Sequence, residues 1–270
     1  MRFSRTSGVG SALINVMTQA AEKAGRSLVR GFGEIESLQV SKKGPADFVS
    51  EADHRAEEII FRELSKARPN FGFHMEERGR VEGADSSNLW LVDPLDGTLN
   101  FLHGLPHFAV SIAHVRDGKL NAGVVYEPVS DQMFSAETGQ GAYLNGHRLR
   151  VSSRHDMSES IFATGIPFKG RGDHGAYLVQ LEQVMAVSAG VRRFGSAALD
   201  LAYVAAGRFD GFWEEGLSTW DIGAGIVLVR EAGGFVSDFS GRDKALETGN
   251  VVAANGALHD SFRKLLKSAG

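Results

Sequence analysis

The sequence LWLVDPLDGTLNF at residues 89–101 indicates both the fold and the place of a candidate site. Its first four residues form an apolar run bounded by Pro94 and Gly97, which is typical of a core strand that ends in a functional turn. Asp93 and Asp96 stand in that turn. Carboxylates at a strand end, beside a glycine that lets backbone N–H groups approach a ligand, suit hard cations and phosphate. An ordinary acidic turn has the same local pattern, so the rest of the chain must decide.

The composition excludes several classes of protein. Of the 270 residues, 43% are hydrophobic and 23% are charged, as in ordinary globular proteins. The net charge of −4 does not indicate the excess of positive charge that binds nucleic acid or an anionic membrane. The absence of cysteine excludes disulfides, thiolate metal sites and cysteine nucleophiles, and it fits a cytoplasmic location. The basic start is followed by an amphipathic segment, and no run of about 18 apolar residues occurs, so we expect neither a signal peptide nor a membrane span.

Hydrophobic periodicity and turn signals predict helices that alternate with sheets along the whole chain. Helices are expected at residues 11–32, 50–68, 98–102, 175–188, 196–207, 220–233 and 257–270. Strands are expected at residues 89–92, 107–115, 119–128, 131–138, 158–165, 209–215, 235–239 and 250–255, with a polar loop at 41–45. No repeat or low-complexity linker divides the chain. We therefore expect one compact layered unit, residues 1–270, in the α/β or α+β class, with at most two tightly joined lobes at about 1–150 and 151–270.

Two serines have the spacing of helix N-caps. Ser50 and Asp53 form a capping-box pattern, which places Asp53 in the first turn of a helix. The helix N-terminus favours the negative charge of Asp53, so we expect this carboxyl group to be ionised. Ser196 similarly predicts the start of the helix that runs to about Gly207.

Acidic residues at the ends of predicted elements are candidates for binding a metal. They are Glu76, Asp93, Asp96 and Asp221. Mg²⁺ prefers oxygen ligands in near-octahedral geometry, and two such ions close together can activate a water and stabilise a leaving oxygen. Taken singly, Glu76 is equally compatible with a solvated surface charge, and Asp221 with a helix cap beside an aromatic residue.

Gly97 and Thr98 form a second candidate set directly after Asp96. The glycine permits a tight turn, and the following helix N-terminus would present free N–H groups to a phosphate. Thr98 could orient a water through its hydroxyl group, or it could be a plain helix cap.

Motifs for other chemistry are weak or missing. GRGDHG at 170–175 matches the dinucleotide-binding pattern, but no clear parallel strand follows its helix and no acid lies near position 195, which favours a loop. The sequence has no GxSxG elbow, no GxxxxGK[ST] loop and no HExxH motif, which argues against serine hydrolases, P-loop NTPases and zinc proteases.

Longer stretches of the chain resemble the inositol monophosphatase family. DPLDGTLNF at 93–101 resembles the first signature of that family, and WDIGAGIVLVREAGG at 220–234 resembles the second. Further matches are KGPADFVSEAD at 43–53, the acidic pair at 76–77, and GSAALDLAYVAAGRFDGFWE at 195–214. The resemblance covers essentially the whole chain. It implies a layered αβαβα sandwich, usually homodimeric, that hydrolyses phosphate monoesters with Mg²⁺.

The resemblance implies a metal site of two or three ions. Glu76 and Asp93 would hold a first Mg²⁺ together with the carbonyl oxygen of Leu95. Asp93, Asp96 and Asp221 would hold a second, and Glu76 would help with a third, weaker ion. Inhibition by lithium is an expectation from the resemblance alone.

It also implies a catalytic pair and a phosphate cradle. Asp53 and Thr98 would orient and deprotonate the attacking water, with Glu76 completing the catalytic set. The backbone amides of Gly97 and Thr98 would hold the phosphate, and Lys43 matches a lysine on a mobile loop near the metal.

The resemblance also implies a pocket for the substrate alcohol. Glu214 matches a carboxylate that binds hydroxyl groups of the inositol ring, and Gly195, Ser196 and Ala197 would line the same pocket with Asp221. Ser196 stands where many members have threonine, and Gly223-Ala224 is a small-for-small departure in the second signature. Met75 and Arg78 flank the acidic pair differently from the family pattern, which affects local loop detail only.

Alternatives to an inositol 1-phosphate substrate remain open. Relatives of this fold act on histidinol phosphate, fructose 1,6-bisphosphate, nucleotide 3′-phosphates or NADP. Glu214 favours a neutral polyol over an extra phosphate or a base, because a carboxylate repels added negative charge. A protein that keeps the fold but works by binding a macromolecule is the alternative of another class.

Overall fold

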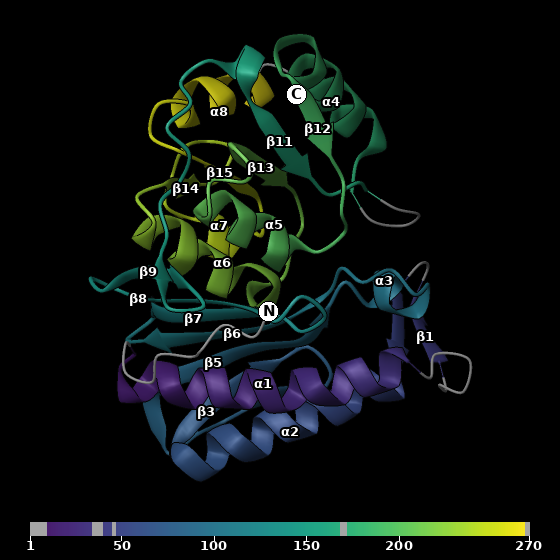
Figure 1. The fold of residues 1–270 in the computed structure, drawn as a ribbon, viewed down its shortest axis with the longest axis vertical. Coiled ribbons are helices and arrows are strands. Elements are labelled where there is room, and N and C mark those ends of the chain that lie inside the picture. Colours follow the sequence, from purple (N-terminus) through teal and green to yellow (C-terminus); the bar gives the residue numbers. More distant parts are fainter. Residues whose placement is uncertain (1–9, 34–39, 45–46, 168–171, 268–270) are drawn as a thin grey trace.

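The chain folds into alternating layers of helices and sheets (Figure 1). The structure is a computed structural model that describes residues 10–33, 40–44, 47–167 and 172–267, without the side chains of 40–44 and 47–49. From the α1–α2 face to the α4–α8 face, helices, an eight-stranded sheet, helices, a five-stranded sheet and helices follow one another. This is the αβαβα sandwich that the resemblance predicted. Among the described residues, none of the helices is long and apolar enough to span a bilayer.

Helices α1 (Ala12–Phe32) and α2 (Glu51–Ala67) cover one face of the eight-stranded sheet. Helix α1 buries the predicted apolar stripe, which includes Met17, Ala20 and Leu28, because residues three and four apart share one face of a helix. Helix α2 begins at the predicted capping box, in which the Asp53 carboxylate accepts the backbone N–H of Ser50 at 2.9 Å.

The eight-stranded sheet has the order β10-β9-β8-β7-β6-β5-β3-β4, and only β3 and β5 pair in parallel. Its strands are β3 (Phe71–Met75), β4 (Gly79–Val81), β5 (Asp85–Asp96), β6 (Ala109–Arg116), β7 (Lys119–Glu127), β8 (Gln132–Glu137), β9 (Gly141–Leu144) and β10 (His147–Arg148). The predicted meander forms β6 to β8. Asn145 and Gly146 close the next hairpin with φ angles of 48° and 82°, as a tight two-residue turn requires.

The five-stranded sheet has the order β12-β11-β13-β15-β14. Its strands are β11 (Ile161–Thr164), β12 (Gly190–Arg192), β13 (Gly211–Glu214), β14 (Phe235–Ser237) and β15 (Val251–Ala254). Helices α4 (His174–Val187) and α8 (His259–Lys267) cover its outer face, and a short 3₁₀ turn, Met157–Glu159, precedes β11.

Two expectations about local structure were wrong. The polar segment 41–45 was expected to be a loop, but β1 (Val40–Gly44) pairs with β2 (Asp47–Ser50). Backbone pairing forms a hairpin there that side-chain polarity does not reveal. No clear parallel strand was expected after helix α4, but β12 follows this helix and pairs in parallel with β11. Strand β12 has only three residues, too few to give a periodic signal.

The GRGDHG motif lies at the start of α4, and its residues 170 and 171 are outside the described part of the chain. Asp173 caps this helix by accepting the backbone N–H groups of Gly175 at 2.8 Å and Ala176 at 3.1 Å. The described residues of the motif therefore have a local structural role.

Helices α5 (Ala197–Ala205) and α6 (Thr219–Glu231) lie between the two sheets with the short α7 (Ala245–Thr248). Small residues let α6 fit there. A Cβ atom on Gly223 would lie 3.0 Å from Leu91 Cδ1, and one on Gly225 would lie 2.5 Å from Leu201 Cβ. The glycines of the second signature therefore set the distance of α6 from the sheet and from α5.

We predict that Gly225→Ala destabilises the protein by about 1–3 kcal/mol, because the added methyl group overlaps Leu201 in a packed core. Gly31→Ala is the matched control. Its Cβ would meet Phe101 at an ordinary 3.5 Å, so the better helix former should add about 0.5–1 kcal/mol. Urea unfolding measures both changes. A Gly225→Ala variant as stable as the unmodified protein would contradict the packing described for α6.

Candidate active site

Strands β3 and β5 bring two acidic residues together. The strands are parallel, and Met75 at the end of β3 pairs with Val92 in β5. Glu76 and Asp93 are the next residues in each strand direction, so they lie side by side at the same edge of the sheet. The backbone N–H of Glu76 donates to the Val92 carbonyl at 3.1 Å, which fixes this juxtaposition.

The two aspartates of the first signature lie at the end of β5. The pairing of β5 with β6 slips between Asp93 and Asp96, where Pro94 cannot donate to the ladder. Asp93 is 3% exposed, and its Oδ1 atom accepts the Leu95 N–H at 2.9 Å. The Asp96 Oδ2 atom accepts the Ser196 hydroxyl at 2.6 Å and the Ala198 N–H at 2.8 Å. Asp96 thus joins the strand end to the start of α5.

Asp221 reaches the same place from α6. Ser111 of β6 pairs with Asp93, and its hydroxyl donates to the Trp220 carbonyl at 3.1 Å. This bond ties the start of α6 to the strand next to Asp93. Asp221 forms the N-terminal capping box of α6 and accepts the Ser218 N–H at 2.7 Å.

Burial and neighbouring charges shift the pKa values of these carboxyl groups. Burial raises the pKa of Asp93 well above its ordinary value, and the charges of Glu76, Asp96 and Asp221 and a hydrogen bond with Glu76 raise it further. Burial raises the pKa of Asp96 to about 6, against the opposing hydrogen bonds from Ser196 and the start of α5. Cations or protons must therefore offset the crowded negative charge.

Within the residues that the structure describes, no three acidic or histidine side chains are arranged to hold a metal ion as they stand. The predicted ligands do converge on one edge of the sheet, and oxygen is the ligand atom that Mg²⁺ prefers. Their assignment as metal ligands accordingly stays a prediction.

Asp53 and Thr98 meet beside this carboxylate cluster. The Thr98 hydroxyl lies 3.1 Å from Asp53 Oδ1 and 3.0 Å from the Leu95 carbonyl, and it can donate to one of them at a time. Asp53 is fully buried. Burial raises its pKa despite hydrogen bonds from Ser50, whereas the helix N-terminus alone was expected to favour the charged form. The raised pKa makes the Asp53 carboxylate a better proton acceptor.

Gly97 places the start of α3 (Thr98–Leu102) next to these groups. Its φ angle of 95° is left-handed, and a Cβ atom would lie 3.1 Å from the His107 carbonyl, so only glycine fits without strain. Thr98 is the first residue of α3, and N–H groups at this position have no partner within the helix.

The predicted substrate residues lie at the start of α5, which α3 contacts through Asn100, and at the end of β13. Gly195 has a φ angle of 81°, and Ser196 is the predicted N-cap of α5, followed by the buried Ala197. Glu214 ends β13 and rests on Gly165, where a Cβ atom would lie 1.9 Å from the Glu214 carboxyl carbon. Lys43 lies in β1, and its side chain is outside the described part.

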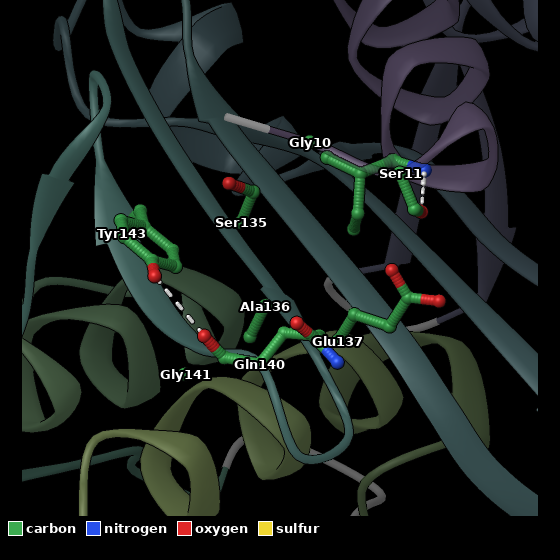
Figure 2. Close-up of a pocket in the computed structure, with 9 residues that line it drawn as sticks. Gly10, Ser11, Ser135, Ala136, Glu137, Gln140, Gly141 and Tyr143 are labelled. Atoms are coloured by element: carbon green, nitrogen blue, oxygen red, sulfur yellow. Dashed lines mark hydrogen bonds between the residues drawn. The ribbon is translucent and has the colours of Figure 1, made fainter. Parts of the chain in front are cut away.

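Two cavities differ in their relation to the site. A small one of about 40 Å³ borders Glu214 between β13 and the start of α4. Another of about 360 Å³ lies between the start of α1 and the β8–β9 hairpin, where the Tyr143 hydroxyl donates to the Gln140 carbonyl (Figure 2). None of the predicted site residues lines the second cavity.

Sequence reasoning missed three polar residues next to the site. The Asn100 amide donates to the carbonyls of His107 at 2.8 Å and Phe194 at 2.7 Å, which joins α3 to the segment before α5. Asp200 is 1% exposed, and its pKa is raised well above the ordinary value by burial and then by Glu214 and Asp96. Glu57 is buried on α2, one turn after Asp53. The sequence did contain a signal for the burial of Asp200, because this acidic residue stands within an otherwise apolar helix.

Comparisons with known proteins show the family and the fold. Residues 11–270 match the sequence model of the inositol monophosphatase family. The inositol-1-monophosphatase of Mesorhizobium japonicum is 61% identical over 95% of this chain and 97% of its own length. Nus factor SuhB of Escherichia coli strain K12 is 47% identical over 90% of this chain and 91% of its own. The crystal structure of extragenic suppressor protein suhB from Bartonella henselae matches with a TM-score of 0.93 and 57% identity, covering 95% of this chain and 99% of that one. By its sequence, its fold and the place of its acidic residues, the chain belongs to the inositol monophosphatase family.

Proposed function

We propose that this protein is a Mg²⁺-dependent phosphatase that hydrolyses inositol 1-phosphate to inositol and phosphate. One observation carries the proposal: acidic side chains from β5, α6 and the segment after β3 crowd together at one edge of the sheet, in a chain of this family. The 61% identical relative from Mesorhizobium japonicum is named for this activity.

The carboxylate cluster fits Mg²⁺ by its chemistry. Its donors are hard oxygens, and the raised pKa of buried Asp93 reflects repulsion that a cation would relieve. We assign the first ion to Glu76, Asp93 and the Leu95 carbonyl, the second to Asp93, Asp96 and Asp221, and a third, weaker one to Glu76. When bound, Mg²⁺ supplies charge neutralisation for the phosphate, a more acidic water and stabilisation of the leaving alkoxide.

The chain's own residues orient the attacking water. Thr98 can donate its hydroxyl proton to Asp53 and accept a hydrogen bond from the water on its free lone pair. Asp53, held by Ser50 and shielded from solvent, then takes the proton through Thr98. The amides of Gly97 and Thr98 hold the phosphate oxygens at the start of α3.

A neutral polyol suits the pocket that we assign to Glu214. Glu214 borders the small cavity between β13 and the start of α4. In this assignment the start of α5 contributes Gly195, Ser196 and Ala197 to the alcohol pocket, with Asp221 between metal and alcohol. Carboxylates accept hydrogen bonds from hydroxyl groups and repel a second phosphate. This supports inositol 1-phosphate over bisphosphate and nucleotide substrates.

We further propose a cytoplasmic homodimer that lithium inhibits. The resemblance supports the homodimer and the inhibition by lithium, and the absence of cysteine fits the cytoplasm. Leu178, Val179 and Met185 of α4 are 61%, 41% and 59% exposed, and such apolar side chains are suited to a contact between subunits.

A regulatory role is the second candidate function, because the 47% identical Escherichia coli relative is named a Nus factor. A catalytic-site variant separates the two functions. If the protein acts by binding a macromolecule, a variant without turnover should retain that role in cells. Loss of the cellular role together with turnover would count against regulation.

We predict that Asp96→Asn lowers kcat with inositol 1-phosphate by about 100- to 1,000-fold. The substitution removes a charged ligand of the cation that stabilises the negative charge of the transition state. The fold should be as stable as before in EDTA, since a buried charge has been removed. Asp85→Asn, at the opposite end of β5, is the control and should retain full activity. Ordinary turnover by Asp96→Asn would refute the assigned site.

We predict that Mg²⁺ raises the melting temperature more at pH 8 than at pH 5.5. The folded-state pKa values of Asp93 and Asp96 are raised, so the folded protein binds more protons than the unfolded chain from about pH 4 to at least pH 6. Without metal, these groups therefore make folding less favourable as the pH rises through that interval. Protons and Mg²⁺ compete for the same oxygens, so the stabilisation by Mg²⁺ should grow as protons leave. Thermal unfolding with Mg²⁺ and with EDTA tests this, and an equal gain at both pH values would contradict it.

We predict that Glu214→Gln raises KM for inositol 1-phosphate about tenfold or more, because hydrogen bonds to a charged acceptor contribute roughly 1.5–3 kcal/mol. Activity on β-glycerophosphate should change much less. Glu182→Gln, the same change at an exposed residue of α4 that does not line this cavity, is the matched control. Steady-state kinetics gives kcat/KM for both substrates. If the ratio of the inositol 1-phosphate value to the β-glycerophosphate value is the same in Glu214→Gln as in the unmodified protein, a different substrate with the same chemistry is favoured.

A further inference from the structure

Helix α2 carries two buried acidic residues one turn apart, Asp53 and Glu57, which are 0% and 3% exposed. Residues four apart lie on the same face of a helix, so both carboxyl groups point toward the sheet edge that carries the candidate site. Asp53 contacts Thr98. The proposed reaction gives no role to Glu57, although burying a carboxyl group costs free energy unless specific partners offset it.

The partners of Glu57 lie in the turn directly after Glu76. The Glu57 Oε2 atom accepts the backbone N–H of Glu77 at 2.8 Å. The Arg78 guanidinium lies farther away, with 3.9 Å between its Nε atom and Glu57 Oε1. Glu57 therefore holds the backbone of the turn through a hydrogen bond to a charged acceptor, which is stronger than one to a neutral group.

Glu76 is thus held from both sides. On one side its N–H donates to the Val92 carbonyl, next to Asp93. On the other side the peptide that joins it to Glu77 is anchored to Glu57. These two bonds fix the direction in which the Glu76 side chain leaves the backbone. The turn itself is short, since β4 begins at Gly79.

We propose that Glu57 is a positioning residue for the metal site, which holds the turn so that the Glu76 carboxylate faces Asp93. The inference rests on the proposed function, in which Glu76 is a ligand of the first Mg²⁺. Helix α2 then serves both halves of the site, because Asp53 orients the water-activating Thr98 and Glu57 orients a metal ligand. Groups that hydrogen-bond behind a ligand typically change metal affinity 10- to 100-fold when they are replaced.

Glu57→Gln is the most direct test, because glutamine keeps the shape but replaces the charged acceptor with a neutral amide, in which one oxygen has become an N–H₂ group. We expect calorimetric titration with MgCl₂, without substrate, to show affinity at least about tenfold weaker than in the unmodified protein. Turnover should recover toward the original kcat at high Mg²⁺ concentration.

The matched control is Glu58→Gln, on the same helix and with the same change in charge. Glu58 is exposed and contacts only the side chain of Arg78 in the same turn, so its replacement should leave Mg²⁺ affinity unchanged. Thermal unfolding in EDTA reports the stability of each variant. Glu57→Ala is a second variant that removes the hydrogen bond to the Glu77 N–H, and it should weaken Mg²⁺ binding at least as much.

A folded Glu57→Gln variant with unchanged Mg²⁺ affinity would overturn the inference, even if its melting temperature fell, because the residue would then be purely structural. A loss of turnover that high Mg²⁺ does not restore would overturn it as well. Failure of the proposed function looks different. In that case the unmodified protein itself would show no Mg²⁺ binding and no phosphate release.

Discussion

Mutual repulsion among carboxyl groups is the constraint on which the rest of this structure depends. Three separate parts of the chain contribute Glu76, the pair Asp93 and Asp96, and Asp221. The fold holds them together although burial and like charges raise the pKa of Asp93. Backbone pairing of β3 with β5 and the glycine-rich packing of α6 impose this closeness. The free energy for it comes from apolar cores on both sides of the large sheet, not from the site. A cation would turn that unfavourable crowding into binding energy.

Much of the fold follows from local signals in the sequence. The amphipathic stripe of α1, the capping box of α2 and the hairpin turn at Asn145-Gly146 each have a local physical cause, and each forms as expected. Strand β12 and the β1–β2 hairpin do not have such signals, because short strands are determined by their neighbours. The two signatures contain residues that meet only through the sheet register, so the resemblance, and not spacing, related Asp93 to Asp221.

The environment of the candidate site residues was even harder to predict from local sequence signals. Sequence reasoning placed Asp53 in the first helical turn and expected the helix N-terminus to govern its charge, but the fold buries this residue completely and raises its pKa. Glu57 and Asp200 escaped notice because their partners lie far away in the sequence. A buried carboxyl group acquires its role from what surrounds it, and only the assembled layers reveal those surroundings.

The most direct test of the account is phosphate release by the unmodified protein, with Mg²⁺ and with EDTA. The substrates would be inositol 1-phosphate, β-glycerophosphate, histidinol phosphate, fructose 1,6-bisphosphate, adenosine 3′,5′-bisphosphate and NADP. The account predicts turnover that requires Mg²⁺ and is fastest, by kcat/KM, on inositol 1-phosphate. Turnover that persists in EDTA, or no release from any of these esters with Mg²⁺, would contradict it.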